Sequence, residues 1–519
     1  MVLAWCGLLA VVLWFRPPAG DDAYHHAVLS VEQVKCWNGG VAWPRFHPDW
    51  NGGTGSFAPS IYAPLVLAIQ GGACALAGEG SRAVGVALVA GLAAGALLLW
   101  ATLRSRGLEG GGPWAVAAYP LAAVLARATT TEVWALAFMA PVLVLALPPG
   151  PSTRGQGLAV AAAAAALAGC QVGGLLMLAW VLAAAWLAAG PARWREGLGT
   201  AAWVAGGVLL GGPLWWPVIR EGRGLATEAL VGGQYDWRTH HALAVGANAE
   251  LGPVLLAVFL GLAGVLLLWI PGGRSGTART LGRGLPAALG AALLLATPLS
   301  APVWRLVPPM AGLQFPWRFL GPATVVGVVL AAALRGRWRW AAVVFLVAPA
   351  ALIPVEVDGG SPRLTPDLGA GALARRAAVR YGLAPVLPSL PGFYAPGFHP
   401  IGSLRALQEQ EGEAVGTGGG CLPRAFEVSA GEGEAVLLLL QWWPWLRVTG
   451  GEGELPYRNR HGLVEVAPGP GRGELVVGEA AAPGRREGLL MTLAGLALLG
   501  ALVPGRREEG GEAVTHRPA

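Results

Sequence analysis

The sequence predicts an all-α, polytopic membrane protein with a small β-rich domain near its C-terminus. Of its 519 residues, 54% are hydrophobic and only 13% are charged, whereas about a quarter of the residues of a soluble protein are charged. Apolar runs close to the roughly 20 residues that cross a bilayer recur over residues 83–355 and again over 488–503. These runs are rich in Ala, Leu, Val and Gly and lack the alternation of a membrane strand, so we expect helices.

The distribution of arginines predicts how these spans alternate across the membrane. Cytoplasmic loops of membrane proteins are enriched in Lys and Arg, and short loops that carry arginines recur at every second turn of this chain. We therefore expect residues 2–15 and 83–103 to be the first two spans, with about twelve spans in all and both termini in the cytoplasm. The arginines of these loops are Arg104 and Arg106, Arg154, Arg193 and Arg195, Arg274, Arg279 and Arg283, Arg335, Arg337 and Arg339, and Arg506 and Arg507.

This alternation leaves residues 16–82 as one long extracytoplasmic loop. Within it, residues 61–77 are apolar, and the arginine pattern requires them to lie along the membrane surface or to re-enter the membrane; a true span is the alternative. The short first run could instead be a cleaved signal peptide. Because no basic segment precedes it and no small-residue cleavage site follows it, we expect an uncleaved first span.

The composition changes between residues 356 and 487. This segment is rich in Gly, Pro, Glu and Arg, and its short apolar stretches, such as residues 435–441 and 463–466, are separated by turn residues. The pattern predicts an extracytoplasmic domain that resembles a β-sandwich. Residues 488–504 should form the final transmembrane helix, and residues 505–519 a polar cytoplasmic tail.

Charge and cysteine content exclude several functions. The net charge of +6 comes from arginines that flank apolar spans, where they set topology, so we expect no nucleic-acid partner. The five cysteines show no CxxC spacing, and we assign neither a zinc site nor a redox motif. Cys36 and Cys421 could form a disulfide if both lie outside the cytoplasm.

Charged residues that could carry function collect at the predicted outer ends of the spans, beginning with Asp21 and Asp22 after the first span. Asp22 begins a stretch, residues 22–37, that can form a surface helix with His26 one turn later. A carboxylate here could act as a general base, with His26 orienting it or binding a metal with it. The alternative is that Asp22 only caps the helix N-terminus.

The same loop continues with aromatic, basic and glycine residues. Trp43, Arg45 and Asp49 precede a glycine-rich turn at residues 51–55. Aromatic faces with a carboxylate suit a sugar, and an arginine suits a phosphate. The alternative is an aromatic belt at the membrane interface, followed by a turn.

Three charged residues flank later spans. Arg127 and Glu132 lie at the outer ends of two successive spans, where they could contact substrate or pair to close a helical hairpin. Arg318 lies where the segment 315–318 begins another span from outside. Its guanidinium could hold a lipid phosphate, or it could extend to the membrane interface.

Short motifs follow one another in a characteristic order. They are Asp22-x3-His26, Gly40-Val-Ala-Trp-Pro44-Arg45-Phe46, Gly53-x-Gly55, Tyr62-Ala-Pro64-Leu65, Arg127-x4-Glu132 with Pro141, Phe315-Pro-Trp-Arg318 and Trp443-Pro444-Trp445. Together they resemble the bacterial membrane proteins labelled 6-pyruvoyl-tetrahydropterin synthase-related, close to the YfhO-like group. The resemblance runs from the first loop through the last span. It does not imply pterin chemistry, because the chain lacks the His cluster and catalytic Cys of a soluble pterin synthase.

The resemblance implies a GT-C-like transmembrane domain over residues 1–355, in a glycosyltransferase that uses a sugar linked to polyprenyl phosphate. In such enzymes an Asp of the first extracytoplasmic loop deprotonates or orients the acceptor hydroxyl, sometimes with a divalent metal, while basic residues hold the donor phosphate. Carried over to this chain, Asp22 is the base, with Asp21 beside it and His26 as its neighbour. Arg45 and Arg318 are the candidates for phosphate.

The motif at Tyr62 adds a further substrate-binding candidate. Two positions depart from the family pattern: Phe46 stands in place of Trp, and no Gly separates Pro444 from Trp445. Both departures concern acceptor recognition and leave the expected fold unchanged.

The sequence thus predicts a multi-pass protein of the bacterial plasma membrane with its active face outside. We expect it to move a sugar from a lipid-linked donor to a cell-envelope glycan or lipid by single displacement with inversion. A flippase or transporter for a lipid-linked sugar and a non-catalytic envelope protein are the alternatives; the scarcity of charge in the spans argues against ion-coupled transport. If the transferase interpretation holds, Asp22, Arg45 and Arg318 should converge on one outward cavity.

Overall fold

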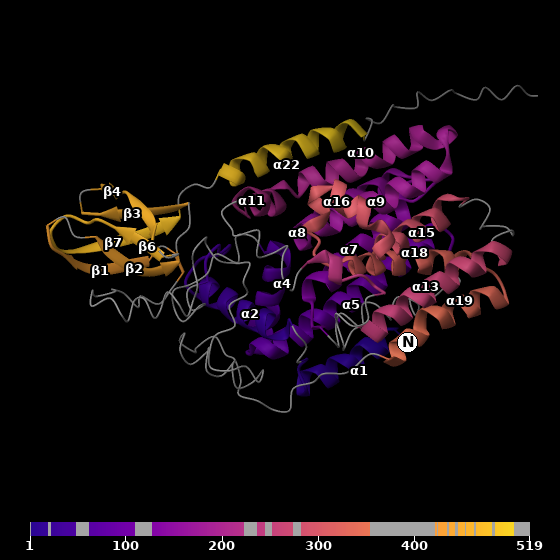
Figure 1. The fold of residues 1–519 in the computed structure, drawn as a ribbon, viewed down its shortest axis with the longest axis horizontal. Helices are drawn as coiled ribbons and strands as arrows, with labels where there is room; N and C mark the ends of the chain where they lie inside the picture. The colour runs from indigo at the N-terminus through magenta and orange to yellow at the C-terminus, as the bar shows by residue number, and fades with distance from the viewer. Residues whose placement is uncertain are drawn as a thin grey trace, which may run out of the picture.

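Apolar sequence forms helices throughout the larger part of the chain, and the C-terminal part adds antiparallel sheets (Figure 1). The chain is described from a computed structural model. The structure describes residues 2–18, 22–47, 62–108, 127–222, 236–243, 252–272, 282–352 and, except for 423, 433–434, 442–444, 452, 461–462 and 480–482, residues 421–502.

Four helical segments in the described part are long and apolar enough to cross a membrane, and the number rises to six if each of two bent pairs is one span. These helices indicate a multi-pass membrane protein, but they do not establish the expected number of about twelve spans. The four are α5 (Gly80–Ser105), α9 (Val172–Ala189), residues Gly252–Ile270 of α13 (Gly252–Gly272), and η8 (Pro316–Phe319) with α18 (Leu320–Ala333). The bent pairs join η4 (Pro191–Arg193) and α10 (Trp194–Leu210) to α11 (Gly212–Gly222), at 72°, and α15 (Gly284–Leu295) to η7 (Pro298–Ser300) and α16 (Ala301–Leu306), at 89°.

Shorter helices complete the helical body. The apolar run predicted at residues 61–77 contains α4, whose 14 residues reach only about 21 Å at 1.5 Å per residue. The helix packs against α2 and α5, and its buried face includes Gln70. The remaining helices of the described part are α1 (Val2–Phe15), α2 (Ala23–Asn38), α4 (Pro64–Ala77), α7 (Thr130–Ala146), α8 (Arg154–Cys170), η6 (Trp237–Thr239), α17 (Pro308–Ala311), α19 (Arg337–Val347), η9 (Ala348–Leu352) and α22 (Pro483–Leu502).

Small residues let the helices approach closely, as is common between membrane helices. A side chain at Gly207 of α10 would collide with the Ala161 carbonyl of α8, and one at Gly495 of α22 would collide with the backbone of α10. At the centre of the body, α18 is buried along its whole length. Its evenly apolar sequence is therefore explained by helices on all sides rather than by lipid.

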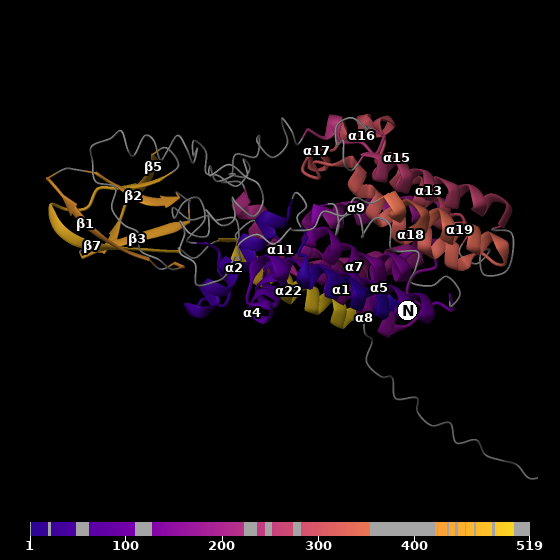
Figure 2. The same ribbon diagram turned by 90° about the horizontal axis from the view of Figure 1, so that it is seen from below.

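The two ends of the helical body hold different parts of the chain. At one end, Gln156 of α8 donates to the Ser105 carbonyl at the end of α5 (3.1 Å), and Trp186 of α9 donates to the Ala146 carbonyl at the end of α7 (3.1 Å). Arginine-bearing turns are thereby gathered at this end. At the opposite end, the starts of α2 and α7 meet, and the sheets lie beyond α2 and α4 in both views (Figure 1, Figure 2).

Among the described residues of the C-terminal part, seven strands form two antiparallel sheets. The stretches expected at residues 435–441 and 463–466 form β2 and β6, which pair with each other. Phe426, Leu438 and Val477, from both sheets, lie in one hydrophobic core, as the sandwich-like pattern predicts. The sheets have the orders β1-β7-β3-β4 and β2-β6-β5, with β1 (Arg424–Ala430), β2 (Val436–Gln441), β3 (Leu446–Gly450), β4 (Gly453–Leu455), β5 (Tyr457–Arg460), β6 (Leu463–Val466) and β7 (Gly471–Glu479).

The first loop of the sequence is fastened to these sheets in two ways. Cys36, near the end of α2, forms a disulfide with Cys421, just before β1, and their Cα atoms are 5.5 Å apart. Phe46 is 1% exposed and packs in the hydrophobic core of the sheets. The pairing that the sequence left open is thus present, and Phe46, one of the two departures from the family pattern, has a structural role.

The disulfide gives a direct prediction for thiol counting. The unfolded, unreduced protein should label at three cysteines, Cys6, Cys74 and Cys170, and should label at five only after reduction. Reduction should also lower the apparent melting temperature, because closing a long loop stabilises a fold by typically 2–4 kcal/mol. A Cys36→Ser/Cys421→Ser variant is the control, since reductant should not change its melting further. Five reactive thiols before reduction would contradict the pairing.

Candidate functional site

The carboxylate of Asp22 faces the turn ahead of α7. Although Asp22 precedes α2, its side chain makes no capping hydrogen bond to that helix, so the alternative of a simple N-cap is wrong. Instead, Oδ2 accepts from Arg127 Nη2 at 3.0 Å and from Thr129 Oγ1 at 2.9 Å, and the Asp22 amide donates to the Arg127 carbonyl at 2.9 Å. The side chain keeps 31% exposure. Asp22 is therefore held firmly but remains accessible.

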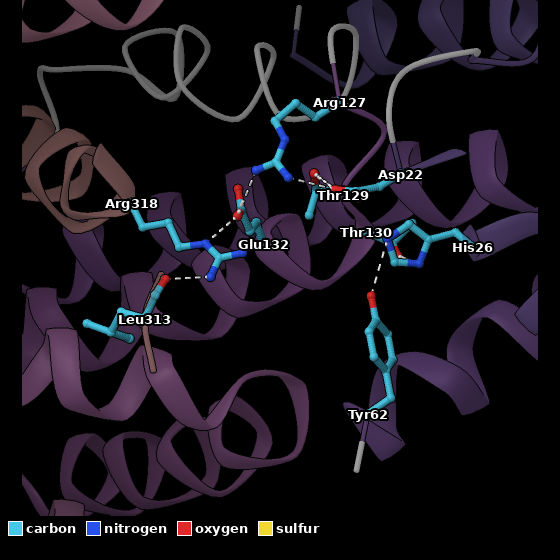
Figure 3. A network of polar contacts seen from close by, with 9 residues as sticks. All are labelled: Asp22, His26, Tyr62, Arg127, Thr129, Thr130, Glu132, Leu313 and Arg318. Carbon is cyan, nitrogen blue, oxygen red and sulfur yellow. Dashed lines mark hydrogen bonds and ion pairs between the residues drawn. The ribbon is translucent and has the colours of Figure 1, made fainter. Parts of the chain in front are cut away.

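Arg127 extends this contact into a chain of alternating charges (Figure 3). Its Nη1 lies 3.5 Å from Oε1 of Glu132, in the first turn of α7, and the same oxygen accepts from Arg318 Nε at 2.9 Å. Arg318 Nη1 also donates to the Leu313 carbonyl at 2.8 Å. The predicted Arg127–Glu132 pair is present, but it is part of a larger charged chain, Asp22–Arg127–Glu132–Arg318, that joins α2, α7 and η8.

Two residues next to members of the charged chain or their partners have unusual backbone conformations. Among the described residues, the non-glycine residues with positive φ are Ala128 (55°) and Gln314 (62°). This left-handed conformation costs an L-residue roughly 1–2 kcal/mol, and such strain concentrates at functional sites. Ala128 lies between Arg127 and Thr129, so the reversal at Ala128 accompanies the arrangement in which both side chains reach Asp22.

Aromatic rings cover the two arginines. The Phe315 and Trp317 rings stack at a centroid distance of 5.3 Å, and the Arg127 guanidinium lies 5.0 Å from the centroid of Trp317. The Arg318 guanidinium lies 4.7 Å from the centroid of Phe315. Stacking on aromatic faces suits the planar guanidinium. It leaves the arginines oriented toward Glu132.

His26 belongs to a buried polar group beside Asp22. Gln70 Nε2 lies 2.7 Å from Nδ1 of His26, and Thr130 Oγ1 lies 3.1 Å from the same nitrogen. The other ring nitrogen, Nε2, faces the Tyr62 hydroxyl at 3.5 Å (Figure 3). The sequence expectation that His26 neighbours Asp22 is met, but α2 is largely buried rather than a surface helix.

Burial and charge set the protonation of this region. Burial lowers the pKa of His26 to about 4, so the imidazole is neutral at pH 7. At Asp22, burial acts to raise the pKa, but the Arg127 guanidinium, His26 and the Thr129 hydroxyl together lower it below its ordinary value. At neutral pH the site thus presents an ionised, partly exposed carboxylate beside a neutral histidine.

Arg45 and Trp43 lie elsewhere. They line a cavity between the first loop, α11, the start of α22 and the β-rich part, together with Arg485. The predicted convergence of the three residues is therefore wrong for Arg45: Asp22 and Arg318 are joined through Arg127 and Glu132, whereas Arg45 lines a cavity that neither of them lines. Asp21 and Asp49 lie outside the described residues.

Sequence reasoning missed three polar residues of the site, namely Gln70, Thr129 and Thr130. Each carried a signal. Gln70 is a polar residue inside an apolar run, and the threonines belong to the polar run between Arg127 and Glu132. In the described part of the chain, no group of three or more His, Cys, Asp or Glu residues is arranged to hold a metal ion.

Comparisons of the chain with known protein families, with curated proteins and with solved structures find no match.

The charged chain predicts different costs for removing its two carboxylates. Glu132 is 4% exposed and pairs with two arginines, so Glu132→Gln removes a buried charge that Arg318 and Arg127 share, leaves Arg127 with Asp22 as its remaining carboxylate in the charged chain, and should cost about 3 kcal/mol. Asp22→Asn, at a more exposed position, should cost about 1 kcal/mol. Unfolding of the purified variants in detergent measures both. A cost at Asp22 equal to that at Glu132 would contradict the charged chain as described.

Proposed function

We propose that this chain is an integral membrane glycosyltransferase of GT-C-like architecture. It would transfer a sugar from a polyprenyl-phosphate donor to a cell-envelope acceptor on the extracytoplasmic face of a bacterial plasma membrane. The observation that carries the proposal is the Asp22 carboxylate, which is ionised, 31% exposed and held through Oδ2 by Arg127 and Thr129. An acceptor hydroxyl can approach Oδ1, because both hydrogen bonds from the described residues end on Oδ2.

Two observations support an outward-facing site. Arginine-rich turns lie at the opposite end of the helical body from Asp22, and such turns are typically cytoplasmic. The Cys36–Cys421 disulfide lies on the same side as the sheets, and disulfides persist mainly in oxidising compartments. Together they support an extracytoplasmic location for the end of the helical body that carries Asp22.

The number of spans belongs to the same proposal. Besides the longer helices, the described part contains apolar helices of 10–17 residues at Cys6–Phe15, Pro64–Ala77 and Thr130–Ala146. With tilt and local thinning of the bilayer, short helices can also be accommodated. Counting them, and α8, α19 and α22, as spans or half-spans brings the total toward the expected number of about twelve.

The proposed reaction is a single displacement with inversion. The acceptor hydroxyl donates a hydrogen bond to Asp22 and attacks the anomeric carbon, while the bond from that carbon to the donor phosphate oxygen breaks. The electron pair leaves with the polyprenyl phosphate, and the hydroxyl proton passes to Asp22. Because Arg127 lowers the pKa of Asp22, the carboxylate is a modest base, so it acts mainly by orienting the hydroxyl and accepts the proton late.

Recognition of the donor phosphate requires positive charge from residues outside the charged chain Asp22–Arg127–Glu132–Arg318. Asp22 and Glu132 together balance Arg127 and Arg318, and both arginines contact Glu132. A phosphate would have to displace a buried carboxylate to reach them, which is costly. The role expected for Arg318 as a phosphate ligand is thus less well supported than the role of Asp22.

The proposal predicts loss of sugar transfer in Asp22→Asn. Membranes with matched expression would be supplied with radiolabelled polyprenyl-phosphate sugars and native envelope acceptors. Removing a general base typically costs 10²–10⁴-fold, so we expect at least about a 100-fold lower rate. Asp236→Asn is the matched control, since Asp236 is also paired with an arginine, Arg238, but lies outside the charged chain.

The other outcomes of this assay separate the alternatives. Equal transfer by wild type and Asp22→Asn would remove Asp22 from the mechanism. Absence of transfer by wild type across a broad donor panel would favour a flippase for lipid-linked sugars or a non-catalytic envelope protein.

A further inference from the structure

An apolar groove on the surface of the helical body lies apart from the charged chain. Only a short turn that contains η4 joins α9 to α10, and helices connected in this way usually pack against each other. Here α9 packs mainly against α15, whereas α10 packs mainly against α8 and against α22, which runs beside it (Figure 1). The two helices therefore diverge, and a groove of about 850 Å³ lies between them. We call it the interfacial groove and define it by Trp186, Trp194, Leu198, Ala201, Trp215 and Met491.

One face of α10 forms the longest wall of the interfacial groove. Its apolar lining residues occupy positions 194, 197, 198, 201, 204, 205, 208 and 209, which is the spacing of a single helical face. At 1.5 Å per residue this wall is about 22 Å long, more than the roughly 15 Å of hydrocarbon in one leaflet of a bilayer. The groove is therefore long enough for an acyl chain that enters it from one leaflet.

The polar groups inside the groove already have partners within the protein. The indole N–H of Trp186 donates to the Ala146 carbonyl at 3.1 Å, and that of Trp215 donates to a carbonyl of α10 at 2.8 Å. The hydroxyl of Thr200, which also lines the groove, donates to the carbonyl one turn earlier in α10 at 2.9 Å. The groove thus offers apolar contacts to an occupant rather than hydrogen bonds.

The end of the groove at Trp194 is basic. Arg193 and Arg195 flank Trp194 in sequence, and neither guanidinium has a hydrogen-bond or ion-pair partner among the described residues. Around the helix, Arg195 is turned by about 100° from Trp194, whereas Glu196 is turned by about 200° and lies on the opposite side of α10. The positive charge beside the groove is therefore not balanced by this carboxylate.

Two observations place this end of the groove at a membrane interface. Trp186 contacts the end of α7, where the arginine-bearing turns gather. Trp194 is 53% exposed, and tryptophan and arginine are typical of the level of the lipid headgroups. An occupant that enters the groove here meets positive charge first and apolar walls further along.

We propose that the interfacial groove binds an anionic phospholipid, with one acyl chain between α9 and α10 and its headgroup beside Arg193 and Arg195. Basic pockets between helices on the cytoplasmic side of membrane proteins typically bind anionic headgroups. The C-terminal tail is a poor occupant, because residues 505–519 are rich in Gly, Glu and Arg. The assignment does not rest on sugar transfer, since the basic end of the groove lies at the opposite end of the body from Asp22.

The test measures lipid retention by the purified full-length protein in detergent, with native mass spectrometry as the readout. The probes are phosphatidylglycerol and phosphatidylcholine with the same acyl chains; both carry a phosphate, but only phosphatidylglycerol has a net negative charge. We expect phosphatidylglycerol to bind at least about fivefold more tightly, because arginines near a lipid surface favour anionic headgroups. Ala201→Trp fills the groove and should remove one bound phosphatidylglycerol per chain.

Matched variants separate this groove from the rest of the lipid-facing surface. Ala162→Trp makes the same change at an exposed alanine of α8 outside the lining, and should leave the lipid bound. Arg195→Gln should lower the affinity for phosphatidylglycerol about fivefold, because one of the two arginines is lost. Arg335→Gln, at another exposed arginine outside the lining, should not change it. Because Ala201 and Arg195 are both exposed, neither substitution should prevent folding.

Four outcomes would overturn the proposal. They are equal retention of the two lipids, an unchanged number of bound phosphatidylglycerol molecules in Ala201→Trp, and equal losses of affinity in Arg195→Gln and Arg335→Gln. The fourth is a wild-type dimer that Ala201→Trp converts to monomers, since a second copy of the chain would then occupy the groove.

Discussion

The helical body depends on one buried carboxylate. Glu132 is almost completely removed from solvent, and a buried charge is tolerated only when it is paired and hydrogen-bonded. Arg127 and Arg318 both meet that requirement through the same oxygen, Oε1. Their positions fix the turn ahead of α7 against the segment that begins α18, the central helix. Arg127 can then offer its second nitrogen to Asp22, which places the start of α2 at the same end of the body.

The first loop connects the charged chain to the β-rich part. It begins at Asp22 in the charged chain, continues through the buried helix α2 to the disulfide at Cys36, and reaches the core of the sheets at Phe46. Arg45, one residue before Phe46, lines the cavity between the first loop, α11 and the start of α22. The candidate catalytic carboxylate, this cavity and the β-rich part are therefore connected by a single short segment.

Much of the fold could be predicted from the sequence, because long apolar runs and strand-like stretches such as residues 463–466 are local signals. The pairing of Arg127 with Glu132 could also be anticipated, since the two are near in sequence. The linkage of Asp22 to Arg318 through Arg127 and Glu132 could not, because it depends on how α7 packs against α18, and apolar helices carry little information about their partners. For the same reason the sequence placed Arg45 with Asp22, although tertiary packing directs Arg45 to a cavity that Asp22 does not line.

The proposed function requires Asp22 to face the extracytoplasmic side of the membrane. Labelling of single introduced cysteines in intact cells with a membrane-impermeant maleimide tests this directly, because the five native cysteines are buried or paired. Arg238→Cys reports on the end near Phe315, since His240 contacts that ring at 4.9 Å, and the exposed Arg195→Cys reports on the arginine-rich end. We expect labelling of Arg238→Cys in intact cells and of Arg195→Cys only after permeabilisation. The reverse pattern would contradict an outward-facing site.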